Sequence, residues 1–176
     1  PIGLGWAVRH PERVERIVIL NTAAFLSPRL PLRIRICRLP VLGALAVRGV
    51  NGFARCGTWM TTVRPLSPAV KEGFCAPYDS WAHRVGILRF VQDIPMRPAH
   101  PTWPLIREID DGLAQFRDRP VLLQWGARDW CFDLAFYESW RTRFPDAAVD
   151  VYGDAGHYLL EDAGDRIAAR VRAFLG

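Results

Sequence analysis

Three short strand-like segments, the first two of them apolar runs, are separated by longer stretches of helical pattern, and they most restrict how this chain can fold. These runs cover residues 17–20, 120–126 and 148–152. The first is continuously apolar and mostly β-branched, which is typical of a buried strand in a parallel sheet. Helical patterns precede the first run, lie between the second and third, and follow the third. This order predicts an α/β fold with a parallel sheet and flanking helices.

Three helices are predicted around these strands. The first covers residues 2–10 and ends at Pro11, because proline cannot continue a helix. The second covers 134–144, where aromatic side chains recur every four residues and so share one face. The third covers 161–175, with acidic residues near its positive N-terminal end.

Residues 27–112 differ from the rest of the chain. They contain ten of its 14 prolines, their apolar pattern is mostly helical, and no clear strand stands out. We therefore predict three parts: a core segment over 1–26, a helical cap over 27–112, and a second core segment over 113–176. The cap is expected to form a lid over a site.

Composition excludes several functional classes. The net charge of +5 comes from arginines scattered among acids, with Lys71 the only lysine, and no basic stripe suits nucleic acid. No apolar stretch approaches the roughly 20 residues of a membrane span, and the chain does not open like a signal peptide. The four cysteines form no CxxC pair and have no histidine at zinc-ligand spacing. We expect a cytoplasmic protein with no metal, cofactor, nucleic-acid partner or transmembrane segment.

Two loop segments carry residues suited to catalysis. Asp129 follows the second predicted strand in WGARD, and His157 follows the third in DAGHYLLED. Ends of parallel strands meet at one edge of a sheet, where a carboxylate can fix the tautomer of an imidazole and stabilise its charged form. The histidine would then be a general base, which needs a nucleophile or a water. Asp133, four residues after Asp129, is the alternative acid.

These segments resemble the α/β-hydrolase superfamily. IGLGWAVRHPERVERIVILNTAAF is similar to the helix and strand after the nucleophile elbow, PVLLQWGARD to the acid strand, and DAGHYLLED to the histidine loop. The family order is nucleophile, acid, histidine, so the resemblance assigns Asp129 as the acid and His157 as the base. The elbow would lie just before Pro1. Since the chain also begins without methionine, we expect it to be the C-terminal part of such a fold.

Within the superfamily, the segment RFVQDIPMRPAHPTW (89–103) resembles the haloalkane dehalogenases and their relatives, the β-lactone decarboxylases of bacterial olefin synthesis. NTAAF and WGARDWCFD are especially similar to the decarboxylase branch. The resemblance implies an aspartate nucleophile and a small apolar substrate, with a β-lactone losing carbon dioxide to leave a cis-alkene. The chemistry needs only side chains and water, so no cofactor is expected. Relatives suggest a multi-enzyme assembly, which the sequence leaves open.

The resemblance also suggests residues for substrate binding. Trp59, Phe90, Trp130 and Phe132 are candidates to line an apolar pocket, although each is equally compatible with core packing. Asn21, at the end of the first predicted strand, is a candidate to contact a substrate oxygen or leaving group, or only to cap the turn there.

Three alternatives to the decarboxylase stay open at this point. A haloalkane dehalogenase shares almost every visible feature. An epoxide hydrolase needs acidic hydroxyl donors on the cap, where Tyr78 is the only tyrosine. The alternative from another class is a truncated, catalytically inactive fragment, because the chain contains no candidate elbow nucleophile.

Overall fold

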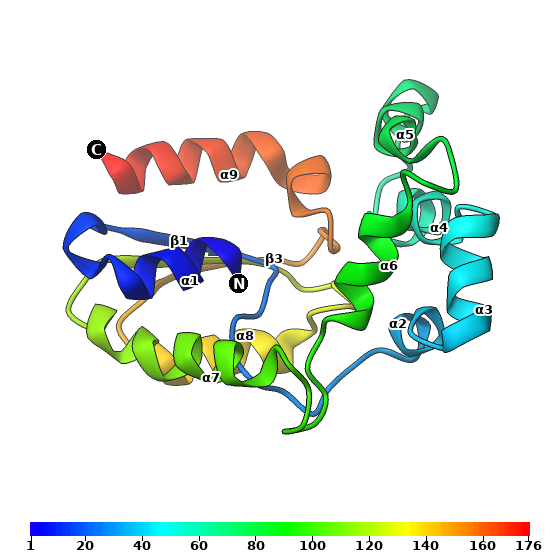
Figure 1. Cartoon of the computed structure of the whole chain (residues 1–176). Helices are drawn as coiled ribbons and strands as arrows, with labels where there is room; N and C mark the ends of the chain where they lie inside the picture. The colour runs from blue at the N-terminus through cyan, green and yellow to red at the C-terminus, as the bar shows by residue number, and fades with distance from the viewer. The chain divides into compact units, whose positions relative to one another are not determined.

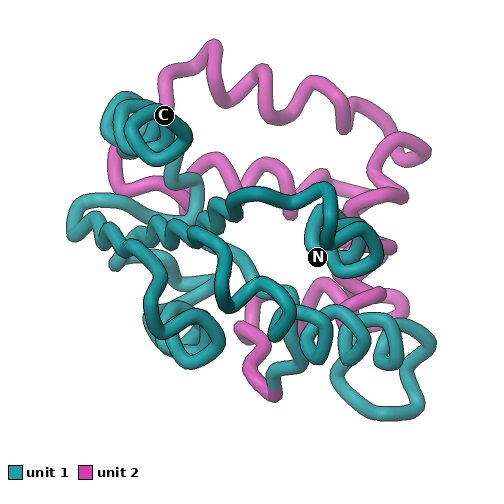
Figure 2. The backbone as a smooth tube through the Cα atoms, turned by 90° about the vertical axis from the view of Figure 1, so that its left-hand side faces the viewer, with its two compact units in different colours: residues 1–27, 95–176 teal, residues 28–94 magenta.

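The computed structural model describes residues 1–176 and divides into two compact units (Figure 2). Unit 1 combines residues 1–27 with residues 95–176, and unit 2 is the intervening segment 28–94. The chain therefore leaves unit 1 once and returns to it, as expected for an insertion between two strands.

Unit 1 is built on a three-stranded parallel sheet in the order β1-β2-β3. The strands are β1 (Ile17–Leu20), β2 (Val121–Gly126) and β3 (Ala148–Tyr152). The middle strand β2 is buried along its whole length. Each strand lies where the sequence predicted one, and the predicted α/β fold with a parallel sheet is confirmed.

Helices cover both faces of this sheet (Figure 1). α9 packs on one face, and α1, α7 and α8 pack on the other. β2 alternates between them: Leu123 and Trp125 join the core beneath α8, while Leu122 and Gln124 point the opposite way. The helices of unit 1 are α1 (Ile2–Arg9), η1 (Pro11–Arg13), α7 (Trp103–Gly112), η4 (Leu113–Phe116), α8 (Leu134–Arg143) and α9 (Leu159–Leu175).

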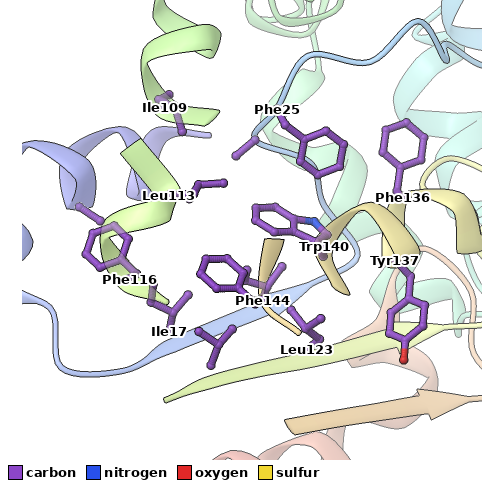
Figure 3. Close-up of a cluster of buried hydrophobic side chains, with 14 of the residues drawn as sticks. Ile17, Phe25, Ile109, Leu113, Phe116, Leu123, Phe136, Tyr137, Trp140 and Phe144 are labelled. Atoms are coloured by element: carbon purple, nitrogen blue, oxygen red, sulfur yellow. The ribbon is translucent and has the colours of Figure 1, made fainter. Parts of the chain in front are cut away.

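Aromatic side chains from α8 fill the larger core (Figure 3). Trp140 stacks on Phe144 at a centroid distance of 6.1 Å and meets Phe25 edge-on at 5.1 Å. The indole nitrogen of Trp140 donates to the carbonyl oxygen of Thr22 at 2.7 Å, so its only polar atom is satisfied. The four-residue spacing seen in the sequence is thus the spacing of a buried helix face.

Unit 2 consists of helices and connecting turns, without a strand. Proline occupies the first turn of α3 and α5, where its missing N–H removes no helical hydrogen bond. No helix in the whole chain combines the length and apolar character needed to cross a membrane. The helices of unit 2 are α2 (Leu32–Cys37), α3 (Pro40–Ala44), the π-helix η2 (Leu45–Gly49), α4 (Gly52–Met60), α5 (Pro68–Cys75), η3 (Ala76–Tyr78) and α6 (Val85–Gln92).

The predicted helical cap ended at residue 112, whereas unit 2 ends at Ile94. The difference is α7, whose Ile106 and Ile109 are buried in the core of unit 1. Ile109 also lies against Gly5 of α1, where a Cβ atom would come within 3.2 Å of it. The proline-rich composition continues into the segment that returns to unit 1, so composition alone does not separate α7 from the helices of unit 2.

Arg84 connects several turns of unit 2. Its guanidinium donates to the carbonyl oxygens of Tyr78 and Arg48 at 2.7 Å each. It also reaches the carbonyl oxygens of Asp79 at 2.8 Å and Gly49 at 3.2 Å. These carbonyls lie at the ends of η2 and η3, which have no further helical turn to satisfy them. One fixed cation therefore holds two helix ends together.

We predict that Arg84→Met lowers the free energy of unfolding by about 2 kcal/mol, because several carbonyls lose a charged donor in a partly exposed setting. Urea titration of both proteins measures the difference. Arg89→Met is the matched control, since Arg89 donates to the side chain of Gln92 at the surface. Equal losses for the two variants would contradict the role given to Arg84.

Candidate functional site

The loops that follow β2 and β3 lie together at one edge of the sheet. The N–H of Ala127 donates to the carbonyl oxygen of Tyr152 at 2.9 Å, and the N–H of Arg128 donates to that of Ala155 at 3.0 Å. These bonds continue the pairing of the two strands beyond their ends. Loops joined in this way hold their side chains at a fixed separation.

Gly126, the last residue of β2, allows the close approach of these loops. A Cβ atom there would lie 2.5 Å from the carbonyl oxygen of Gly156 and 2.6 Å from that of Ala155. Both contacts are with backbone, which cannot rotate away as a side chain can. Any other residue at position 126 would push the histidine loop outward.

Asp129 and His157 meet across these loops. Oδ2 of Asp129 lies 2.9 Å from Nδ1 of His157. Oδ1 of the same carboxylate accepts hydrogen bonds from the N–H groups of Cys131 at 2.7 Å and Phe132 at 3.0 Å. The carboxylate is fully buried, and the imidazole keeps 24% of its surface exposed. Three donors therefore compensate for the burial of the charge.

This geometry selects one tautomer of the histidine. An ionised carboxylate can only accept, so the proton between the two groups belongs to Nδ1. Nε2 is left with a lone pair that can accept a proton from a water molecule. Once protonated, Nε2 can donate a hydrogen bond to an anion. The buried charge of Asp129 stabilises the imidazolium that then forms. The structure thus brings the two predicted residues together, and their role in a reaction stays a prediction.

Asp133, the alternative acid, has a different position. It precedes α8, and its Oδ1 accepts a hydrogen bond from the N–H of Ala135 at 3.0 Å. This is the geometry of a helix N-cap. The structure therefore pairs His157 with Asp129 and uses Asp133 to begin the helix.

Asn21 lies at the end of β1, where its φ of 33° is in the left-handed region that asparagine tolerates. Its buried amide donates to the carbonyl oxygens of Gly156 at 2.7 Å and His157 at 3.2 Å. Its Oδ1 accepts from the N–H of Gly126 at 2.9 Å. Backbone groups thus occupy both amide hydrogens. These bonds join two distant loops, which neither the predicted turn cap nor the predicted substrate contact describes, and contact of Asn21 with a substrate stays a prediction.

The four aromatic residues predicted to line a pocket fall in both units. Phe132 lies beside His157, with ring centroids 5.6 Å apart, and Trp130 is half-buried in the same turn. Trp59 on α4 and Phe90 on α6 belong to unit 2, where both rings are largely exposed. Their contact with a substrate stays a prediction.

Asp162 is a buried residue of the site that the sequence did not reveal. It was expected only to favour the N-terminal end of the last helix. Its Oδ2 instead accepts a hydrogen bond from the N–H of Gly156 at 2.8 Å, directly before His157. The available signal was a carboxylate in the first helical turn after a loop that contains glycine.

No group of three or more potential metal ligands lies together in the chain.

Comparison with known proteins gives close relatives of the whole chain. It is 43% identical to a cis-3-alkyl-4-alkyloxetan-2-one decarboxylase of Shewanella oneidensis, over 99% of this chain and 56% of that protein. The corresponding decarboxylase of Xanthomonas campestris is 41% identical, over 99% and 59%. The chain is a homologue of these decarboxylases. It therefore spans somewhat more than half the length of the curated relatives it matches.

More distant relatives include a haloalkane dehalogenase of Mycolicibacterium paratuberculosis, 31% identical over 97% of this chain and 55% of that protein. No protein-family model matches the chain.

Solved structures identify the fold. A loop variant of a haloalkane dehalogenase from Bradyrhizobium elkanii superimposes with a TM-score of 0.85 at 20% identity, over 98% of this chain and 62% of that one. A haloalkane dehalogenase from Agrobacterium tumefaciens gives 0.82 at 24% identity, over 98% and 62%. The chain has the haloalkane dehalogenase-like α/β-hydrolase fold. The resemblance to β-lactone decarboxylases and haloalkane dehalogenases that the sequence indicated is confirmed.

We predict that Gly126→Ala lowers the free energy of unfolding by about 2 kcal/mol, because the added methyl group overpacks against two carbonyl oxygens. Thermal or urea unfolding measures the change. Gly153→Ala is the matched control: it is a glycine of the neighbouring loop whose Cβ would have no atom within 4 Å. A destabilisation shared by both variants would argue against the close approach at Gly126.

The reactivity of Cys131 tests its burial beside Asp129. Burial, and secondarily the charge of Asp129, raises the pKa of the Cys131 thiol to about 12. At pH 8.5 this thiol is therefore almost entirely protonated, and we predict that iodoacetamide leaves Cys131 unmodified while it alkylates the exposed Cys56. Peptide mass spectrometry measures both sites in one sample. Alkylation of Cys131 as fast as Cys56 would contradict the prediction.

Proposed function

We propose that the protein containing this chain is a β-lactone decarboxylase, which converts a cis-3-alkyl-4-alkyloxetan-2-one into a cis-alkene and carbon dioxide. The observation that carries the proposal is the Asp129–His157 pair, held at the strand ends of a chain that is 43% identical to a decarboxylase of that name. In the proposal, Asp129 is the acid partner and His157 acts on the substrate.

The proposed reaction uses a carboxylate nucleophile. In the family order of nucleophile, acid and histidine it would precede Asp129, and the resemblance of residues 2–25 to the helix and strand after the nucleophile elbow implies that it would also precede those residues. The carboxylate attacks C4 of the lactone ring, forms an ester and breaks the bond from C4 to the ring oxygen. The electrons of the C2–C3 bond then form the C3=C4 double bond as the enzyme carboxylate leaves and carbon dioxide departs. Neither water nor a proton is consumed.

Because no proton is transferred overall, the pair is proposed to act electrostatically. When the ring opens, the lactone ring oxygen becomes one oxygen of a carboxylate. An N–H on Nε2 of His157 can donate to the negative charge that develops there. Asp129 stabilises the positive imidazole that this requires, since its own charge is buried and directly bonded to Nδ1. The aromatic ring of Phe132 beside His157 offers an apolar surface for an alkyl chain.

A haloalkane dehalogenase is the second candidate, supported by 31% identity to an enzyme of that name. Its reaction hydrolyses an ester intermediate, so His157 would remove a proton from water through Nε2. The same pair thus suits both reactions, and the higher identity to the decarboxylases favours the first. A capping role for unit 2 with Trp59 and Phe90, a cytoplasmic location and a multi-enzyme assembly stay predictions.

The test uses the longest gene product that contains this sequence, supplied with a cis-3,4-dialkyl β-lactone and, in parallel, with a 1-haloalkane. We expect release of the cis-alkene, measured by gas chromatography and mass spectrometry. Asp129→Asn and His157→Gln should each lower kcat about 10²-fold or more, because each removes the charge pair at the reacting atoms.

Asp133→Asn is the matched control, since asparagine also caps helices and Asp133 bonds the first turn of α8. We expect its kcat to stay within about twofold of the wild-type value, which corresponds to a change of less than about 0.5 kcal/mol in the activation free energy. Halide release without alkene would move the function to dehalogenation. An inactive protein would favour the non-catalytic alternative, and equal losses at Asp129 and Asp133 would contradict the assignment of the acid.

A further inference from the structure

We infer that Asn21 and Asp162 are positioning residues that hold Gly156 from two sides and thereby set the place of His157 against Asp129. The inference rests on the proposed function only for its kinetic readout. It assigns a role in the reaction to two buried side chains that donate to or accept from the backbone of the histidine loop.

The first observation concerns Gly156 itself. Its N–H donates to Oδ2 of Asp162 at 2.8 Å, and its carbonyl oxygen accepts from Nδ2 of Asn21 at 2.7 Å. Both side chains are buried, one in the first turn of α9 and the other after β1. Both backbone polar groups of the residue before His157 are thus fixed by side chains rather than by secondary structure. A loop held in this way has little freedom to rotate.

The second observation connects this arrangement to the acid. Oδ1 of Asn21 accepts from the N–H of Gly126, and the carbonyl oxygen of Gly126 accepts from the N–H of Asp129 at 3.1 Å. One amide therefore bonds the turn that carries Asp129 and the loop that carries His157. The 2.9 Å contact between the two side chains depends on that link.

The third observation is that Asn21 is suited to this position by its backbone as well as its side chain. A φ of 33° is strained for most residues and tolerated by asparagine, aspartate and glycine. Aspartate would present oxygens to two carbonyl oxygens, and glycine would present nothing. Asparagine combines the backbone conformation with two donors and an acceptor.

The test compares Asn21→Gly with the wild type in the protein that contains this chain. Glycine keeps the positive φ, so the variant removes the amide without adding backbone strain. We expect the Nδ1 proton of His157, seen as a downfield ¹H resonance, to broaden or vanish because it is no longer held on Asp129. We expect kcat to fall about 10²-fold with KM little changed, as for a misplaced reacting group.

Asn51→Gly is the matched control. Asn51 also has a positive φ, of 54°, is buried, and donates to a backbone carbonyl oxygen, that of Tyr78, but it belongs to unit 2. It should leave the His157 resonance unchanged, even where it lowers stability.

At the other side of Gly156, Asp162→Ala should reproduce the effect of Asn21→Gly. Asp162→Asn should retain most of the resonance, because its amide oxygen can still accept from Gly156.

The outcomes separate this inference from the proposed function. A sharp His157 resonance in Asn21→Gly, or a loss of equal size in Asn51→Gly, would overturn the positioning role. The resonance needs no substrate, so a protein that does not convert the lactone still tests the inference. Loss of the resonance in Asn21→Gly and Asp162→Ala together, with retention in Asn51→Gly, would support it.

Discussion

The pairing of β2 between β1 and β3 is the constraint on which the other features of unit 1 depend. β2 is buried throughout and bonded to a parallel strand on each side. Because all three strands run the same way, their following loops emerge at one edge of the sheet. Each loop contributes one member of the site: Asn21 after β1, Asp129 after β2 and His157 after β3. A shift of one residue in either register would separate them.

The buried polar side chains at this edge of the sheet help to position one imidazole, that of His157. Asn21, Asp129 and Asp162 are all buried, and each bonds a loop that carries the acid or the histidine. Burial of a polar group is costly unless it is hydrogen-bonded, so the arrangement is stable only when its partners are in place. Gln124 differs: it is also buried, on the face toward α9, and its Oε1 has no hydrogen-bond partner. Its Nε2 donates to Asp150 and to the hydroxyl oxygen of Tyr152, so only the amide oxygen is left without a partner.

Strands and most helices of unit 1 could be predicted because their signals are local. Short segments of four to six mostly apolar residues and an aromatic residue at every fourth position reflect burial within single elements. The partners of Asn21 lie 135 and 136 residues away, and no local pattern shows that its amide would meet Gly156 and His157. The predicted end of the helical cap, residue 112, differs from the end of unit 2 at Ile94 for a related reason. The apolar stripe of α7 fits a core equally well in either unit, and only tertiary packing assigns it to unit 1.

The choice between Asp129 and Asp133 was likewise open in the sequence, and the turn between them explains how two nearby carboxylates divide their roles. Oδ1 of Asp129 caps two N–H groups of its own turn, and Asp133 caps the helix that follows. The indole of Trp125 donates to the carbonyl oxygen of Phe132 at 2.9 Å, which fixes the middle of the turn to the strand. With one oxygen engaged locally, only Oδ2 of Asp129 is directed to His157. Glutamate is one methylene longer and would alter one or both contacts, whereas asparagine would place a donor where an acceptor is required. The short side chain of aspartate is thus what lets one residue both close the turn and orient the imidazole.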